Sequence, residues 1–246
     1  MKIPAFITVR SQSSRLPEKC FKSFGEGTVI EHVINRCLYY GLRPIVCTTE
    51  LACDESIIVL AREASIEFFQ GNAINKLMRW RDCARKFNIT QFHTIDADDP
   101  FFCGEEVNRS FQCLCNGDFD MVCPTQSSSN GGATVGYSLK ASAIELACEN
   151  TTKNTDTEMM WSYMNQLENI RTFVLSEPNR FKITERMTLD YHEDYIFLEA
   201  VRTLLGSFAS REEIYKLLIN NPDLAMINSS RNEEWAKNQK KKLFRE

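Results

Sequence analysis

A cluster of cations and hydroxyl groups lies near the start of the chain, in the stretch Arg10–Lys19 (RSQSSRLPEK). It directly follows a short apolar run that predicts a first β-strand. In open parallel sheets, ligands bind beyond the carboxyl ends of the strands, and the loop after the first strand is the usual phosphate-binding loop. The side chains of Arg10, Arg15 and Lys19 suit the oxygens of a triphosphate. Ser11, Ser13 and Ser14 add hydroxyl and backbone donors. The alternative is an ordinary solvated surface loop.

A second polar cluster, Ile95–Pro100 (IDADDP), follows another predicted strand. Repulsion among Asp96, Asp98 and Asp99 is costly unless a cation lies among them. On an extended segment Asp96 and Asp98 share one side, and Asp99 points the other way. Carboxylates without a nearby His or Cys cluster suit Mg²⁺, which binds one or two carboxylates together with substrate phosphates. The alternatives are an Asp-rich turn before the proline and an N-cap for the next helix.

A third cluster, Arg186–Tyr195 (RMTLDYHEDY), joins an apolar run to a predicted helix. Asp190 ends the apolar run and is a candidate second metal ligand. Glu193 and Asp194 fall in the first turn of the helix, where negative charge is stabilised by the helix dipole. We therefore predict mainly a capping role for Asp194.

Strand-like apolar runs alternate with helix-like periodicity, a pattern that predicts a parallel sheet covered by helices. The expected strands are Pro4–Val9, Pro44–Thr49, Ile66–Gln70, Gln91–Ile95, Asp120–Pro124, Ala133–Leu139, Ile170–Leu175 and Phe181–Leu189. The expected helices are Val29–Tyr40, Glu55–Ala64, Asn75–Phe87, Gly104–Asn116, one from Ala141, Asp156–Leu167, His192–Leu205 and Glu212–Ile219. Thr28 and Ser210 are the expected N-caps of two of these helices, and Thr125–Gly132 is predicted to be a loop.

The length of 246 residues, of which 43% are hydrophobic, suits one α/β domain, which we place at residues 1–230. Residues 231–246 form a charged C-terminal tail, which is either solvated, as a helix or a frayed end, or a partner-binding arm. The net charge of -4 argues against broad binding to nucleic acid. Apolar runs are too short to span a membrane and no signal pattern begins the chain, so we expect a cytoplasmic protein.

The ten cysteines are scattered through apolar segments, and the chain has only three histidines. This spacing is poor for a zinc site, and we expect most of the thiols to be reduced and buried. Cys113 and Cys115, one residue apart, leave open a metal or redox pair.

The order of these motifs resembles the cytidylyltransferase family that includes the 3-deoxy-manno-octulosonate and acylneuraminate cytidylyltransferases and the SpsF-like spore-coat proteins. RSQSSRLPEK is similar to the family's Arg-x-x-Ser-x-Arg-Leu-Pro-x-Lys signature, and RMTLDYHEDY to its Arg-Leu-Thr-Val-Asp-Thr-Pro-Glu-Asp ending. FFQGNAINKLMRW and DADDPFF lie between them in the family's order. The resemblance implies an α/β, Rossmann-like nucleotide-diphosphosugar transferase fold, with a mostly parallel mixed central sheet and helices on both faces.

The resemblance also implies roles for single residues. Mg²⁺ would be held by Asp98 and Asp190. The implied catalytic residues are Arg10, Arg15, Lys19 and Asp98. The implied nucleotide-binding residues are Val9, Arg10, Ser11, Arg15, Lys19, Gly71, Arg79 and Asp96. The implied substrate-binding residues are Gly132, Glu158 and Arg186.

The implied activity is Mg²⁺-dependent transfer of CMP from CTP to a sugar acid of the 3-deoxy-ulosonate or nonulosonate type, with release of pyrophosphate. Such enzymes serve cell-surface glycan and lipopolysaccharide biosynthesis, and a homodimer is implied. The segment Asp96-Ala97-Asp98 stands where the octulosonate enzymes have Gln-Gly-Asp. That departure keeps two alternatives open, namely a nucleotidylyltransferase for a sugar phosphate or phosphonate, and a nucleotide-binding protein without catalysis.

Overall fold

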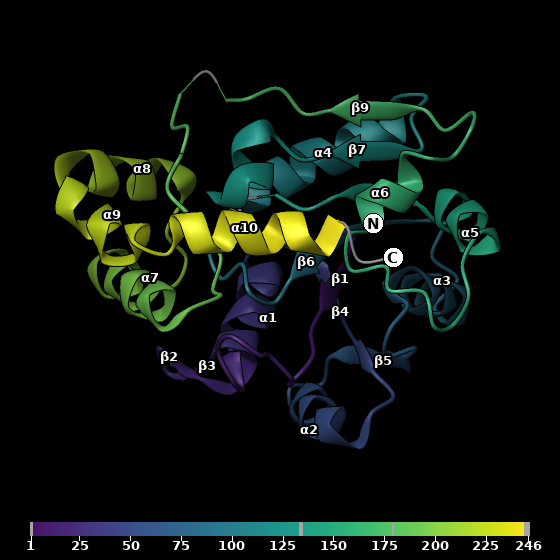
Figure 1. The fold of residues 1–246 in the computed structure, drawn as a ribbon, viewed down its shortest axis with the longest axis horizontal. Helices are drawn as coiled ribbons and strands as arrows, with labels where there is room; N and C mark the ends of the chain where they lie inside the picture. Colours follow the sequence, from purple (N-terminus) through teal and green to yellow (C-terminus); the bar gives the residue numbers. More distant parts are fainter. Residues whose placement is uncertain (1, 133–134, 179, 244–246) are drawn as a thin grey trace.

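The computed structural model describes residues 2–132, 135–178 and 180–243. A seven-stranded sheet in the order β5-β4-β1-β6-β8-β7-β9 forms the centre of the molecule (Figure 1). Its strands are β1 (Pro4–Thr8), β4 (Arg43–Thr49), β5 (Glu67–Gly71), β6 (Gln91–Asp96), β7 (Met121–Cys123), β8 (Ser138–Lys140) and β9 (Thr172–Val174). A small hairpin pairs β2 (Ser23–Phe24) with β3 (Gly27–Thr28).

Helices surround the sheet. They are α1 (Val29–Tyr39), α2 (Glu55–Glu63), α3 (Lys76–Lys86), α4 (Gly104–Asn116), α5 (Ala141–Glu149), α6 (Met160–Met164), α7 (His192–Leu205), α8 (Arg211–Asn220), α9 (Pro222–Ser229) and α10 (Asn232–Leu243). The predicted N-caps are confirmed: Thr28 forms a capping box at the start of α1, and Ser210 forms one at the start of α8.

The sheet is mixed but mostly parallel, as predicted. Strands β5, β4, β1 and β6 are parallel neighbours, while β8 runs antiparallel to β6 and β7. Successive side chains of β1 enter different cores, because a strand alternates its faces. Phe6 packs with residues of α3 and α5, whereas Ala5 and Ile7 pack with residues of α1 and α2. Both faces of the sheet are thus covered by helices.

A third core ties the opening loop to the C-terminal half of the chain. Leu16 of that loop belongs to the same buried cluster as Met187 and Leu189, together with the inner faces of α7 and α8. The loop behind β1 and the segment that carries Asp190 are therefore held together by shared apolar packing. This packing brings residues far apart in the sequence to one place.

Several predicted elements differ from the structure. The segment 180–189 is irregular although its apolar residues alternate, and the predicted helix 156–167 is reduced to α6. Of the predicted strand 133–139, only Ser138 and Leu139 lie in a strand, and residues 133–134 lie outside the described residues. The predicted loop Thr125–Gly132 contains a short helical turn, η3 (Ser128–Gly132).

Six of the ten cysteines are buried, and all ten are free thiols. Cys115 is exposed, and its thiol donates to Gln91 Oε1 over 3.1 Å.

Within the described residues no helix combines the length and apolar character needed to cross a membrane. Thr125–Gly132, with the strand predicted after it, is the candidate contact of the implied homodimer, and most of this turn is buried in the chain itself. The homodimer stays a prediction.

Two buried histidines make the stability of the fold dependent on pH. His32 donates to the Pro100 carbonyl over 2.9 Å, and His93 lies 2.8 Å from the Ser138 hydroxyl. Burial lowers the pKa of His32 to about 4 and that of His93 to about 3. Because the unfolded chain takes up these protons more readily, stability is lost as the pH falls from about 6.5 toward 4.

We expect each buried histidine to cost about 2 kcal/mol of unfolding free energy at pH 5 relative to neutral pH. Urea unfolding at about pH 7.5 and about pH 5 measures this difference. His192 is exposed, so His192→Gln is the matched control and should keep the wild-type pH dependence. A wild-type free energy of unfolding that stays constant between the two pH values would contradict the prediction.

Candidate active site

The carboxyl ends of β1 and β6 lie side by side. Thr8 and Asp96, the last residues of these two parallel strands, are register partners. The backbone N–H of Ala97 donates to Thr8 O over 3.0 Å, so the two chains leave the sheet together. Both predicted polar loops therefore begin at the same edge, which is where open α/β sheets bind ligands.

A cavity of about 480 Å³ opens beyond this edge. Nine of the residues predicted for the site line it: Val9, Arg10, Arg15, Lys19, Arg79, Asp96, Asp98, Glu158 and Asp190. Most of these residues lie at or beyond the ends of β1, β6, α5 and β9, whereas Arg79 lies on α3. Together they carry both cations and carboxylates. The cavity is a polar site of the size that small-molecule ligands occupy.

Lys19 lies at the centre of the charge arrangement. It begins the short 3₁₀ helix η1 (Lys19–Phe21), and its Nζ lies 2.5 Å from Asp98 Oδ2 and 3.3 Å from Asp190 Oδ1. Burial by itself would lower the pKa of Lys19, but the two carboxylates hold it above the ordinary lysine value. The two predicted metal ligands thus face the same ammonium group.

Backbone contacts explain why Asp98 and Asp190 meet. The N–H of Leu189 donates to Asp98 O over 2.7 Å, and Lys19 Nζ donates to Leu189 O over 3.0 Å. The next residue, Asp190, also forms an ion pair with Arg15. Burial would raise the pKa of Asp190, but the cations Lys19 and Arg15 lower it. The carboxylate therefore stays ionised in the site.

Asp194 has the capping role that the sequence predicted. Its Oδ2 accepts from the backbone N–H groups of Asp190 and Tyr191, over 2.9 and 2.8 Å. Arg186 is buried and forms an ion pair with the same carboxylate at 2.5 Å. Arg186, which was expected to bind substrate, does not line the cavity. In this structure it stabilises the turn that presents Asp190.

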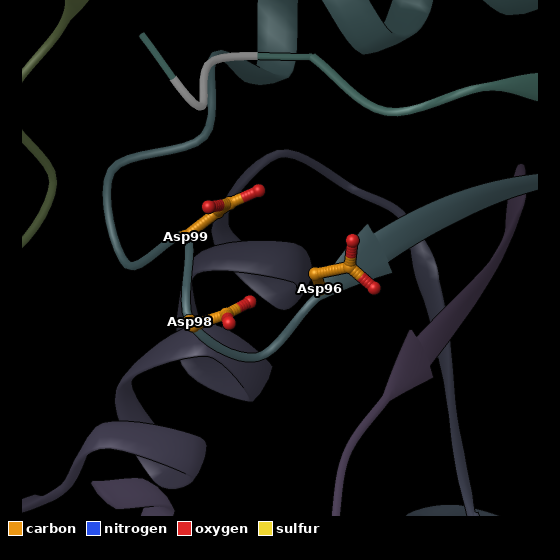
Figure 2. Close-up of side chains that lie close together, drawn as sticks. All are labelled: Asp96, Asp98 and Asp99. Carbon is orange, nitrogen blue, oxygen red and sulfur yellow. The ribbon is translucent and has the colours of Figure 1, made fainter. Parts of the chain in front are cut away.

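Asp96, Asp98 and Asp99 lie close together at the end of β6 (Figure 2). One carboxylate oxygen from each of Asp96, Asp98 and Asp99 lies within 4.8 Å of the others. The prediction that Asp99 points away is wrong, because the strand ends at Asp96 and the chain turns. Enclosure by protein atoms and repulsion from Asp98 and Asp96 raise the pKa of Asp99 well above its usual range. A cation would relieve this repulsion.

Arg79 of α3 also lines the cavity. It is 4% exposed, its Nη1 donates to Asn72 O over 2.7 Å, and its Nε is buried with no hydrogen-bond partner among the described residues. Gly71 lies beneath it, and a Cβ added there would come within 3.1 Å of the Arg79 side chain and within 2.6 Å of Phe69. Gly71 does not line the cavity, but it gives Arg79 the room to enter.

Glu158 is surrounded by cations. Its carboxylate lies 3.5 Å from Arg10 Nη2 and 3.6 Å from Lys242 Nζ. Burial would raise the pKa of Glu158, but Lys76, Arg10 and Lys242 lower it well below the usual glutamate range. A second cavity of about 180 Å³ adjoins the first here, and both are lined by Arg10, Glu158 and Lys242.

Two other predicted residues lie outside the cavity lining. The hydroxyl and the N–H of Ser11 both donate to Asp54 Oδ1, over 2.6 and 2.7 Å. Ser11 therefore anchors the start of the loop after β1 to Asp54. Gly132 lies against the backbone, and a Cβ there would come within 2.6 Å of Ser127 O. Its neighbour Gly131 lines the cavity instead.

Several cavity residues escaped the sequence analysis. They are Lys76, Tyr137, Trp161, Thr188, Trp235, Asn238, Gln239 and Lys242, among others. Four of these lie on α10, the segment expected to be a solvated or partner-binding tail. The signal that could have found them is the spacing of Trp235, Asn238 and Lys242, which places them on one helical face.

No family profile matches the chain. An uncharacterized protein of Methanocaldococcus jannaschii is 24% identical over 238 residues, 94% of this chain and 96% of that protein. Among solved structures, a cytidylyltransferase from Leptospira borgpetersenii has a TM-score of 0.81 and 19% identity, covering 92% of this chain and 97% of that one. CMP:2-keto-3-deoxy-manno-octonic acid synthetase, solved with CTP, has a TM-score of 0.60 and 13% identity, covering 83% and 99%.

These likenesses extend over most of the chain and nearly all of each solved structure. They show that the chain has the Rossmann-like α/β fold of nucleotidyltransferases, with the mostly parallel sheet and flanking helices that the sequence predicted. Activity has to be argued from the site, because one fold can carry several functions.

Proposed function

We propose that the chain is a Mg²⁺-dependent cytidylyltransferase that transfers CMP from CTP to a sugar acid of the 3-deoxy-ulosonate or nonulosonate type. The observation that carries the proposal is the contact of Lys19 with both Asp98 and Asp190, at the floor of a polar cavity beyond β1 and β6. Cations for a triphosphate and carboxylates for its metal ion are thus available in one place. The two solved cytidylyl enzymes of the same fold support this choice.

The cations of the opening loop suit the triphosphate. Arg15 and Lys19 are partly buried and already held by Asp190, so little side-chain entropy is lost when an anion binds. The guanidinium of Arg79, which lines the same cavity, offers a further positive charge.

The carboxylates fit a magnesium ion. Asp98 is close to Asp96 and Asp99 on one side and shares Lys19 with Asp190 on the other, and hard oxygen ligands are those that Mg²⁺ prefers. In the proposed complex Asp98 and Asp190 would hold the ion, and Lys19 would turn from them to the phosphates. When bound, Mg²⁺ supplies positive charge that neutralises the phosphate oxygens during transfer.

The proposed reaction is an in-line displacement at the α-phosphorus of CTP. A bond forms between the acceptor oxygen and phosphorus, and the bond to the bridging oxygen breaks, so that pyrophosphate leaves with the electron pair. The acceptor hydroxyl releases its proton to water. Arg10, Arg15 and Lys19 stabilise the charge that develops on the departing pyrophosphate, and the walls of the cavity orient the two reactants.

The smaller cavity supports an acidic acceptor. It is lined by Asp156, Ser162 and Tyr163 in addition to the residues that it shares with the larger cavity. Lys242 lies 3.6 Å from Glu158, longer than a direct hydrogen bond, so it remains available to a carboxylate of the acceptor. The hydroxyls of Ser162 and Tyr163 suit a polyhydroxylated sugar chain.

A nucleotide screen followed by a turnover assay tests the proposal. With Mg²⁺ present, CTP should raise the thermal midpoint more than UTP, ATP or GTP, because a ligand of the native state stabilises it. Pyrophosphate release should then appear with one member of a sugar-acid panel. If pyrophosphate were released only with sugar phosphates or phosphonates, one of these would be the acceptor in place of a sugar acid. CTP binding without release from any acceptor would favour a binding protein.

A further inference from the structure

Helix α10 is a wall of the proposed active site. In Figure 1 it crosses the middle of the molecule, drawn in yellow, and five of its residues line the large cavity: Trp235, Asn238, Gln239, Lys241 and Lys242. This differs from the solvated tail expected from the charged sequence. The face of α10 that enters the cavity must therefore influence what binds there.

The two oxygens of the Asp190 carboxylate are held by different parts of the chain. Oδ1 faces Arg15 and Lys19 of the opening loop, whereas Oδ2 accepts from the indole Nε1–H of Trp235 over 2.9 Å. The Asp190 side chain is only 5% exposed, so water competes little for these contacts. We propose that Trp235 is a positioning residue: its indole N–H fixes Oδ2 and leaves Oδ1 turned to the reactants. This inference rests on the proposed function.

Helix α10 is fixed to the same short segment that carries Asp190. Arg186 Nε donates to Asn232 Oδ1 over 3.0 Å, and Arg231 Nη2 lies 2.9 Å from Glu193 Oε1. One turn beyond Trp235, the Asn238 side chain donates to the Tyr191 hydroxyl over 3.0 Å. Contacts before and after Trp235 thus set the position of the indole relative to Asp190. A partner held on both sides can orient a carboxylate, as residues behind metal ligands do.

The same helix also reaches the acceptor end of the site. Lys242 lies 3.6 Å from Glu158, two turns beyond Trp235 on the same face. A single rigid element therefore contacts Asp190 at one end and Glu158 at the other. The placement of α10 links the metal and phosphate end of the cavity to the acceptor end.

The test is Trp235→Phe, which keeps an aromatic ring but removes the donor. We expect kcat to fall about tenfold and the Mg²⁺ half-saturation to rise about tenfold, as when the partner of a metal ligand is lost. The KM for CTP should change by less than about twofold, because the cations of the loop are untouched. Lys237 is exposed on the outer face of α10, so Lys237→Ala should match the wild type in all three values.

Calorimetric titration of Mn²⁺ provides a readout that does not depend on turnover. With a CTP analogue that cannot release pyrophosphate, Trp235→Phe should bind Mn²⁺ about tenfold more weakly than the wild type. Asn238→Ala removes the neighbouring contact of α10 and should show a smaller loss in the same direction. Thermal unfolding of each variant checks that the fold is retained.

The outcomes separate the two levels of the argument. Wild-type Mn²⁺ affinity and wild-type kcat in Trp235→Phe would overturn the positioning role, whereas the pyrophosphate release of the wild type would still support the proposed function. If the wild type released no pyrophosphate and yet Trp235→Phe weakened Mn²⁺ binding to the protein alone, the positioning role would stand and the proposed function would fall.

Discussion

Replacing Asp98 by asparagine is expected to lower CTP-dependent pyrophosphate release by about a hundredfold to a thousandfold, the range lost with one preorganised charge contact. Asp98 contacts Lys19 at 2.5 Å, and one of its carboxylate oxygens lies within 4.8 Å of oxygens of Asp96 and Asp99. Asparagine keeps the shape of the side chain and leaves the backbone carbonyl that accepts from Leu189. It removes the negative charge that would hold a cation between this turn and Asp190.

The same change should leave the fold almost as stable as before. Asp98→Asn loses an ion pair with Lys19, but it also removes repulsion from Asp96 and Asp99, and these two effects oppose each other. We expect the free energy of unfolding to change by no more than about 1 kcal/mol. Asp223→Asn, at an exposed position of α9, makes the same chemical change outside the site. If Asp98→Asn kept more than a tenth of the wild-type turnover, the proposed role of Asp98 in holding the metal ion would be wrong.

The geometry of the phosphate end followed from the sequence because parallel strands place their carboxyl ends at one edge. Once β1 and β6 were expected as strands, the loops that begin at Val9 and Ala97 had to lie close to each other. Their charges then predicted what they could bind. Local periodicity and one topological rule were sufficient for this part of the site.

The second half of the chain was harder to predict because tertiary packing overrides local pattern there. Ile183, Met187 and Leu189 alternate as in a strand, yet they pack into the core of α7 and α8 from an irregular segment. Burial favours apolar side chains in an irregular segment just as it does in a strand. The pattern therefore indicates which side chains are buried, but it does not indicate whether the backbone is a strand or a loop.

Arg186 and Trp235 were misjudged for the same reason. The sequence shows that Arg186 is a cation near Asp190. It does not show that Arg186 forms a buried ion pair with Asp194. A lysine-rich terminal helix is usually solvated, and one tryptophan among its charges carries little local signal. Only the packing of α10 on the Asp190 segment places the indole against a carboxylate oxygen.

Lys19→Met is expected to lower kcat/KM for CTP by at least about a hundredfold and to tighten metal binding to the ligand-free protein. The first effect follows because the ammonium group is proposed to stabilise the leaving pyrophosphate. The second follows because, without nucleotide, Lys19 Nζ lies between Asp98 and Asp190 and competes with a metal ion for both carboxylates. These opposite changes distinguish Lys19 from a residue that only maintains the structure.

Mn²⁺ titration without nucleotide and steady-state turnover with CTP measure the two effects of Lys19→Met. Lys22 follows η1, three residues further along, and does not line the cavity, so Lys22→Met removes the same charge nearby as a matched control. The lost ion pairs should cost about 2 kcal/mol of unfolding free energy in Lys19→Met, which urea unfolding will show. If metal binding to the ligand-free Lys19→Met protein were weaker than in the wild type, the ammonium would not be competing with the ion. The proposed exchange of Lys19 for Mg²⁺ between Asp98 and Asp190 would then be wrong.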